Sequence, residues 1–278
     1  MDIASIIGLC LSWGGLVTAV LIVGGHLGAF IAVDAMFIIF AGTLGATFLS
    51  YPMATMLNAF NVAKNAFVAK ELDYMGAVST MVNFATKARR EGLLGLEEDV
   101  DGLEDKFLQK GMQLVVDGTD AALVRNIMET DLAFLEARHR QGESIFTAMG
   151  GYSPTLGIVG TVMGLIHVLS VVGDDPAAMM KGVATAFIAT FYGISTANLI
   201  WLPIAGKLKV RNEEEVLMRQ VMVEGVLSIS AGDNPRIVEE KLKAFLPPKY
   251  KAVTIAAKGE GAAAGREEKE PAAPAAKK

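Results

Sequence analysis

Small residues recur at helical spacing within one long apolar stretch, and hydroxyl side chains border the face that they form. Gly157, Gly160 and Gly164 share one face of a helix, with Ser153 and Thr161 beside it. A hydroxyl oxygen can bind a hard cation or order water. A threonine in a helix can equally bond back to a carbonyl of its own helix. For Thr161 the residues alone leave both interpretations open.

A second apolar stretch carries a matching face. Small residues at such intervals let helices approach closely in lipid, where van der Waals packing replaces the hydrophobic drive. Both faces are therefore predicted to pack against other helices, either within this chain or in a neighbouring one. Its hydroxyls pose the same alternatives as Thr161. The residues of this second face are Ala186, Ala189, Thr190, Gly193 and Ala197, with the hydroxyl of Thr185 close by.

Carboxylates are the usual mark of an ion relay inside a membrane, and these stretches lack them at depth. Asp34 stands at the outer mouth of an apolar run, where a role as helix N-cap explains it equally well. Asp174 and Asp175 fall in a short outer turn, and His167 is interpreted as a polar residue near the membrane surface. If the chain lines an ion path, we expect the carboxylate to come from another polypeptide.

Four apolar runs position these residues. They cover about residues 3–23, 35–51, 145–172 and 182–204, each near the roughly 20 residues that a membrane helix needs. Because backbone groups in lipid must be satisfied within their own segment, each run is predicted to be a helix. The first run lacks a basic start and is too long for a cleaved signal peptide, so we expect it to remain as a membrane helix.

The placement of basic residues predicts the topology. Of the 25 Lys and Arg residues, 10 lie in residues 52–144 and 14 lie from residue 204 onward. The short turn at residues 24–34 has none, and the turn at residues 171–181 has only Lys181. The positive-inside rule therefore puts both termini and the large insert in the cytoplasm.

The predicted fold class is an all-α integral membrane protein with four transmembrane helices and a helical cytoplasmic domain. The single Cys10 excludes an internal disulfide, and no nucleotide, zinc or catalytic motif is present, so we expect neither an enzyme nor a metal or cofactor site. The net charge of −5 gives no sign of nucleic-acid binding. The predicted parts are residues 1–51 with two spans, 52–144 as the cytoplasmic domain, 145–204 with two spans, 205–251 as cytoplasmic helices, and 252–278 as a disordered tail. The last helix of the cytoplasmic domain is expected to continue into the third span, and one of the later helices is expected at about residues 235–245.

Two prolines and two charged pairs each admit a structural explanation and a functional one. Pro154 and Pro203 delete a backbone donor near span ends, which predicts a kink or a cavity edge, or only the end of a helix. Arg89–Arg90 and Glu97–Glu98 flank a glycine-containing break. Basic residues that end one helix and acidic residues that open the next suit the helix macrodipole, and the same charges could dock a partner.

Motifs in chain order resemble those of the MotA/PomA flagellar stator family, within the MotA/TolQ/ExbB superfamily, over about residues 3–250. They accompany the plan of four spans with a large insert between the second and third. The motifs are Arg-Arg-Glu-Gly-Leu-Leu-Gly-Leu-Glu at 89–97, Pro-Thr-Leu-Gly-Ile-Val-Gly-Thr-Val-Met-Gly-Leu at 154–165, Ala-Phe-Ile-Ala-Thr-Phe-Tyr-Gly at 186–193, and Leu202-Pro203.

This resemblance implies a subunit of the bacterial inner membrane that forms a pentameric ring around a dimeric MotB/PomB-like partner. The partner's membrane aspartate would bind the permeating H⁺ or Na⁺, and ion flow would drive the rotor protein FliG. Arg89 and Glu97 resemble the family's rotor-contact charges, and Arg90 and Glu98 adjoin them. Pro154 and Pro203 resemble its conformational prolines.

The resemblance gives conflicting indications of the coupling ion. Thr161 is similar to the threonine of sodium-type stators, whereas Ala189 precedes Thr190 where those stators tend to have two threonines. The sequence leans to sodium through Thr161. The alternative function is an ExbB/TolQ-type energiser of outer-membrane transport, whose relatives typically have three spans and an external N-terminus. A free-standing channel is a third hypothesis, and it would need its own coupling site.

Overall fold

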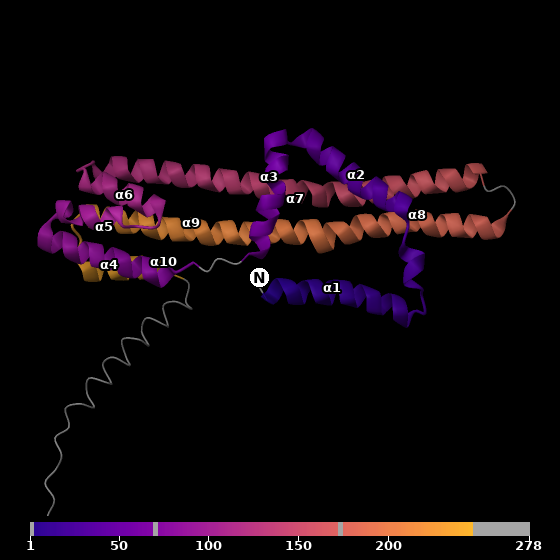
Figure 1. Ribbon diagram of the computed structural model, residues 1–278, viewed down its shortest axis with the longest axis horizontal. Helices are drawn as coiled ribbons and strands as arrows, with labels where there is room; N and C mark the ends of the chain where they lie inside the picture. The colour runs from indigo at the N-terminus through magenta and orange to yellow at the C-terminus, as the bar shows by residue number, and fades with distance from the viewer. Residues whose placement is uncertain (1–2, 69–71, 172–174, 247–278) are drawn as a thin grey trace, which may run out of the picture. The chain divides into compact units, whose positions relative to one another are not determined.

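A computed structural model of the chain describes residues 3–68, 72–171 and 175–246, and every regular element in that part is helical (Figure 1). The predicted all-α fold class is confirmed. The predicted disordered tail at residues 252–278 lies outside the described residues, as does Asp174.

The chain divides into two compact units. The membrane unit contains residues 1–71 and 134–214, and the bundle unit contains residues 72–133 and 215–278. This boundary differs from the predicted domain at residues 52–144. The difference arises because the residues next to the spans bury their apolar side chains against the spans. That buried cluster comprises Met56, Ala59, Ala66, Ile145, Phe146, Met149, Ile204 and Ala205.

Four helices of the described chain are long and apolar enough to cross a membrane, as predicted. They are α1 (Ile3–Ile22), α2 (Val33–Ser50), the second half of α7 (Ala121–Val171) and the run that begins with α8 (Pro176–Thr196). The α7 helix continues unbroken from the insert into the third span, also as predicted, with Pro154 in its interior.

Two helix starts differ from the sequence-based expectation. The N-cap of α2 is Ala32, so Asp34 lies exposed in the first turn and does not cap the helix. The α8 helix starts at Pro176, about six residues before the predicted run, because Asp175 caps it. The Asp175 carboxylate accepts hydrogen bonds from the backbone N–H groups of Ala177 at 2.9 Å and Ala178 at 3.4 Å.

The fourth span does not end at Pro203. A π-helix (Ala197–Trp201) joins α8 to α9 (Leu202–Ser230), so one helical run continues past the proline. Proline has no N–H to donate four residues back. The wider turn of the π-helix accommodates the missing donor, because the N–H of Leu202 bonds to the carbonyl of Ala197, five residues earlier. Pro203 therefore lies within a continuous helical run and does not end the fourth span.

The connection between the first two spans contains a short 3₁₀ helix (Leu27–Phe30) whose last residue is hydrogen-bonded to α8. The Tyr192 hydroxyl donates a hydrogen bond to the Phe30 carbonyl, and the backbone N–H of Ala32 lies 3.4 Å from the same hydroxyl. The rings of Phe30 and Phe191 pack edge to face at 5.5 Å. On the other side, α3 (Met53–Phe67) follows α2 after the Tyr51–Pro52 turn.

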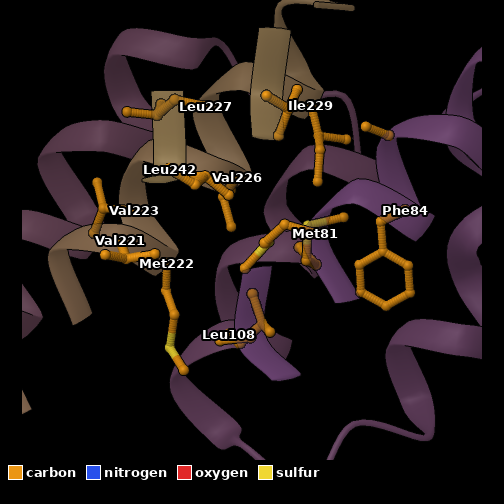
Figure 2. Close-up of a cluster of buried hydrophobic side chains, with 14 of the residues drawn as sticks. Met81, Phe84, Leu108, Val221, Met222, Val223, Val226, Leu227, Ile229 and Leu242 are labelled. Atoms are coloured by element: carbon orange, nitrogen blue, oxygen red, sulfur yellow. The ribbon is translucent and has the colours of Figure 1, made fainter. Parts of the chain in front are cut away.

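The bundle unit consists of helices around its own apolar core. Its helices are α4 (Tyr74–Glu91), a 3₁₀ turn (Leu93–Leu96), α5 (Glu97–Asp101), α6 (Lys106–Val116), α10 (Pro235–Phe245), and the adjoining parts of α7 and α9. Figure 2 shows Met81 of α4 among side chains from α6, α9 and α10. The bounds of α10 agree with the helix predicted at residues 235–245.

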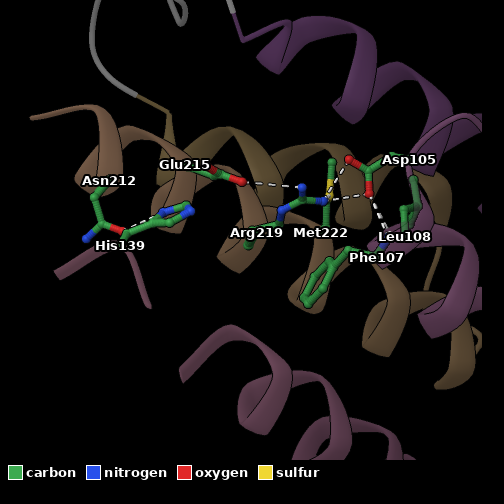
Figure 3. Close-up of polar contacts among 8 residues, drawn as sticks. All are labelled: Asp105, Phe107, Leu108, His139, Asn212, Glu215, Arg219 and Met222. Atoms are coloured by element: carbon green, nitrogen blue, oxygen red, sulfur yellow. Dashed lines mark hydrogen bonds and ion pairs between the residues drawn. The ribbon is translucent and has the colours of Figure 1, made fainter. Parts of the chain in front are cut away.

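One ion pair links α6 to α9 in this unit (Figure 3). Asp105 caps α6 through the N–H groups of Phe107 and Leu108, both at 3.0 Å, and its oxygens also lie 2.6 and 2.7 Å from Arg219 Nη1. The Arg219 side chain is 18% exposed and stacks over the Phe107 ring at 5.0 Å. Glu215 lies 3.5 Å from its second nitrogen.

Replacing Arg219 with alanine should destabilise this unit, because the Asp105 carboxylate would lose a largely buried partner. We expect a cost on the order of 2 kcal/mol, a drop of roughly 5 °C in the melting temperature of the purified chain. Arg125→Ala is the matched control, since Arg125 is 49% exposed in its pairs with Glu129 and Glu224. Exposed pairs contribute about 0–1 kcal/mol. Equal losses in the two variants would contradict this ranking.

Candidate functional site

The backbones of α7 and α8 approach closely because glycines stand at their contact. A Cβ on Gly157 would lie 3.1 Å from the carbonyl oxygen of Ala189, and one on Gly193 would lie 2.6 Å from the carbonyl oxygen of Ser153. Added Cβ atoms on Gly160 and Gly164 would lie 2.8 Å from the side chains of Ala189 and Ala186. The predicted packing faces therefore meet each other within this chain.

Two hydroxyls face each other across this contact. The Oγ1 atoms of Thr161 and Thr190 are 2.5 Å apart. Thr161 Oγ1 also lies 2.9 Å from the Ala186 carbonyl and 3.1 Å from the Gly157 carbonyl, and Thr190 Oγ1 lies 3.4 Å from the Gly157 carbonyl. Four oxygens thus converge at one point between two apolar helices. Oxygen atoms of this kind bind hard cations. Here the two hydroxyls are hydrogen-bonded to each other and to the two carbonyls.

This geometry refines the two interpretations of the hydroxyls. Thr185 bonds back to the Lys181 carbonyl of its own helix at 3.1 Å, the structural alternative. Thr161 bonds back to its own helix and also across to α8, so it is both a packing group and an available oxygen. Ala189 is 2% exposed against Gly160, which leaves no space there for a second threonine.

A second hydroxyl pair at the same contact escaped the sequence analysis. Ser153 Oγ and Thr196 Oγ1 are buried and 2.6 Å apart. The sequence did contain a signal, because extending the stripe from Ala189 and Gly193 by three residues leads to Thr196. The α7–α8 contact therefore carries two polar pairs along its length.

The charged pairs predicted near residue 90 stand on one turn of the bundle unit. Gly92 ends α4 with a φ of 79°, a conformation that side chains other than glycine rarely adopt. Lys87 Nζ and Asp99 Oδ2 form a bridge of 2.8 Å across the turn. The hydrogen bond to Asp99 raises the pKa of Lys87 above its ordinary value. Fully buried Leu96 and Val100 anchor the far side.

The four predicted contact charges are exposed and keep their side chains free. Arg89 and Arg90 lie in the last turn of α4, and Glu97 and Glu98 lie in the first turn of α5. Within the part of the chain that the structure describes, none of the four forms a side-chain hydrogen bond or ion pair. Their placement suits the helix macrodipole, as predicted, and leaves them available to a partner.

Sequence comparison shows what the chain resembles over its full length. Residues 99–221 match the MotA/TolQ/ExbB proton channel family. Motility protein A of Bacillus subtilis is 36% identical over 271 residues, covering 97% of this chain and 100% of that protein. The chemotaxis protein PomA of Vibrio alginolyticus is 35% identical over 255 residues, covering 92% of this chain and 99% of that protein.

Solved structures agree with these relatives. The flagellar MotAB stator complex from Bacillus subtilis matches with a TM-score of 0.84 at 36% identity, covering 91% of this chain and 99% of that chain. MotAB from C. jejuni matches with a TM-score of 0.84 at 30% identity, covering 89% and 97%.

The four candidate spans and the family match identify a multi-pass membrane subunit of an ion channel. The relatives that it matches over nearly their whole length are motility proteins. The chain belongs to the MotA/TolQ/ExbB proton channel family, as a flagellar motor stator subunit of the MotA/PomA type.

Gly193→Ala should weaken the α7–α8 contact, because the new methyl group would lie 2.6 Å from the Ser153 carbonyl and 3.0 Å from Gly157 Cα. Backbone atoms cannot move aside as a flexible side chain can, so we expect a cost on the order of 2 kcal/mol. Thermal unfolding of the purified chain in detergent measures it. Gly151→Ala is the control, since no atom lies within 4 Å of its added Cβ. Equal melting temperatures for both variants would refute the close contact.

Proposed function

We propose that this chain forms a homopentameric ring around a dimer of a MotB/PomB-like partner in the bacterial inner membrane, with both termini in the cytoplasm. Flow of H⁺ or Na⁺ along the ring would generate torque on the rotor protein FliG. The partner and the ring are supported by the similarity to subunits of solved MotAB complexes. The orientation is supported by the distribution of Lys and Arg.

The ion path is proposed to combine the partner's carboxylate with the oxygens of α7 and α8. In the described part of the four spans the one acidic residue is Asp34, which is exposed at a helix start. Thr161 and Thr190 are half-buried in the protomer, so one side of the pair remains open to a helix that packs against it. A carboxylate brought there would find two hydroxyls to orient it or its ion.

The observation that best supports torque generation is the turn at residues 89–98, on which four charged side chains are exposed. Arg89, Arg90, Glu97 and Glu98 would contact FliG through complementary charges, which give orientation and fast exchange more than tight binding. A ring that steps along a rotor needs contacts that form and break repeatedly. Exposed charges, each contributing roughly 1 kcal/mol or less, suit that requirement.

Pro154 and Pro203 are proposed as the points where ion binding changes helix shape. Each removes a backbone donor from a helix, so a carbonyl one turn earlier lacks its usual partner. Pro154 lies in the interior of α7, next to Ser153 of the buried hydroxyl pair. Pro203 is the second residue after the π-helix. Both positions can bend at lower cost than an unbroken helix.

The same family includes TolQ and ExbB, so an energiser of outer-membrane transport is the alternative. Four candidate spans and nearly full-length agreement with motility proteins favour the stator. A reporter fused to the N-terminus separates the two further, since an external N-terminus would contradict the proposed orientation.

Expression of this chain with a MotB-type partner in a non-motile strain without stators should restore swimming. Swimming speed is compared in sodium buffer and in sodium-free potassium buffer. Thr161 favours sodium dependence and Ala189 opposes it, so speed that falls to zero without sodium identifies Na⁺ as the ion. Unchanged speed identifies H⁺. Absence of swimming in both buffers, with both proteins in the membrane and a matched FliG present, would reject the stator function.

Glu97→Lys should reduce swimming while the chain still reaches the membrane, because the reversed charge would repel its partner on FliG. We expect a change on the order of 1 kcal/mol in the contact, seen as a smaller halo in soft agar. Glu104→Lys is the matched control, since Glu104 is also exposed and lies outside the turn. Loss of Glu97→Lys from the membrane fraction would instead support a purely helix-capping role for Glu97.

A further inference from the structure

A surface cavity of about 600 Å³ lies in the membrane unit, lined by residues of α7 and α9. That volume is within the roughly 300–1,000 Å³ of ligand pockets in proteins. A hydrogen bond of 3.1 Å between His139 Nδ1 and Asn212 Oδ1 joins the two helices there (Figure 3). Asn212 lines the cavity and is only 7% exposed. The cavity is therefore bounded by a fixed contact between the two helices.

Charged side chains of both signs line this cavity. Arg140 and Glu136 form an ion pair of 2.6 Å along α7. Within the described part of the chain, the other three charged side chains on its wall form no ion pair. They are one cation and two carboxylates: Lys209, Glu143 and Glu213. A ligand that carries both a positive and a negative group would find partners for each.

The cavity lies where three of the apolar runs end. Tyr51 on its wall is the C-cap of α2, and its hydroxyl donates to the Ser144 carbonyl at 2.8 Å. Ser144 directly precedes the third apolar run, and Lys209 follows the fourth by five residues. Tyrosine and lysine are typical of the level at which spans leave the bilayer. The cavity is therefore at the depth of lipid headgroups.

The polarity of the cavity wall changes in the direction expected for a bound lipid. The lining residues of α7 share one helix face and change from charged to uncharged toward the span. In chain order they include Glu136, Arg140, Glu143 and Thr147. A phospholipid changes likewise, from its charged headgroup to its glycerol and then to its acyl chains. This agreement favours a membrane lipid over a soluble molecule.

The charged groups also distinguish among headgroups. A guanidinium has five donors, so Arg140 can hold Glu136 and still donate to a lipid phosphate. A primary ammonium offers three donors to carboxylates such as Glu143. The trimethylated ammonium of phosphatidylcholine has no N–H, and phosphatidylglycerol has no positive group. Ethanolamine is therefore the headgroup that fits the wall.

We propose that this cavity binds phosphatidylethanolamine, with the phosphate at Arg140 and Lys209 and the ammonium at Glu143 and Glu213. The bound lipid bridges α7 and α9 where they leave the bilayer. This inference needs neither the ion path nor the rotor contact. Soluble glycerophosphoethanolamine carries the same charged groups, and a second copy of the chain could cover the cavity in a ring. The experiment separates both from lipid.

Native mass spectrometry of the full-length chain, in its purified oligomeric form, tests the proposal. Phosphatidylethanolamine, phosphatidylglycerol and phosphatidylcholine with the same acyl chains are added in turn at equal concentration, and the retained lipid is counted per subunit. Glycerophosphoethanolamine is added in a fourth sample. Arg140→Gln and Glu143→Gln each remove one charge from the cavity. Arg138→Gln is the matched control, since Arg138 is exposed on the same helix and does not line the cavity.

We expect the unchanged chain to retain phosphatidylethanolamine severalfold more than the other two lipids. Each cavity variant should lose this preference, and Arg138→Gln should keep it. Equal retention of the three lipids, or a preference that survives both cavity variants, would overturn the proposal. Equally strong binding of glycerophosphoethanolamine would assign the cavity to a soluble ligand and overturn it as well.

Absence of retained phosphatidylethanolamine on the unchanged chain would also overturn the proposal. Dissociation of the oligomer by the cavity variants would then identify a second copy of the chain as the occupant. If Arg140→Gln fails to assemble, Glu213→Gln removes a charge from the α9 side of the same cavity and carries the same outcomes.

Discussion

The close approach of α7 and α8 is the constraint on which the membrane unit depends. Lipid supplies no hydrophobic drive for two apolar helices to associate, so the contact must come from packing at short range. Gly157 and Gly193 permit this, with their Cα atoms near the facing backbone. Only at this separation can the short side chains of Thr161 and Thr190 reach each other. The contact between the two threonines therefore depends on the glycines that bring the helices together.

The bundle unit is stabilised by a different balance of forces. Its helices bury apolar side chains away from water, and this burial is the main source of its stability. Lys87 and Asp99 bridge the turn, while Leu96 beneath it is fully buried. The turn at residues 92–96 is therefore fixed from inside, and its outer charges are not needed to stabilise it.

Local patterns in the sequence predicted much of this structure. The four runs, the continuous α7 and the helix at residues 235–245 follow from apolar length and periodicity, which are local signals. The pairing of Arg219 with Asp105 joins residues far apart in the chain, and no spacing rule indicates such a partner. The membership of α3 in the membrane unit was missed for the same reason, since its buried face is defined by residues of α7 and α9.

The candidate sites were predictable to different extents. Thr161 and Thr190 stood out because hydroxyls are scarce among apolar residues, but only coordinates reveal that they meet. Pro203 was the only sequence signal for the π-helix. A widened turn depends on how the whole helical run adjusts to a missing backbone donor, which the sequence does not indicate. The roles of the contact charges and of both prolines still rest on family resemblance and remain predictions.

The π-helix also changes the direction in which the residues after it face along the fourth span. Gly193 and Ile204 are eleven residues apart, so an uninterrupted α-helix would turn both toward the same neighbour. The widened turn between them moves Ile204 round by roughly a quarter of a turn. One helical run can therefore press Gly193 against α7 and still deliver Ile204 to the cluster with α3. A one-residue deletion between residues 197 and 201 would therefore rotate the helix residues that follow it and change the neighbours that they contact.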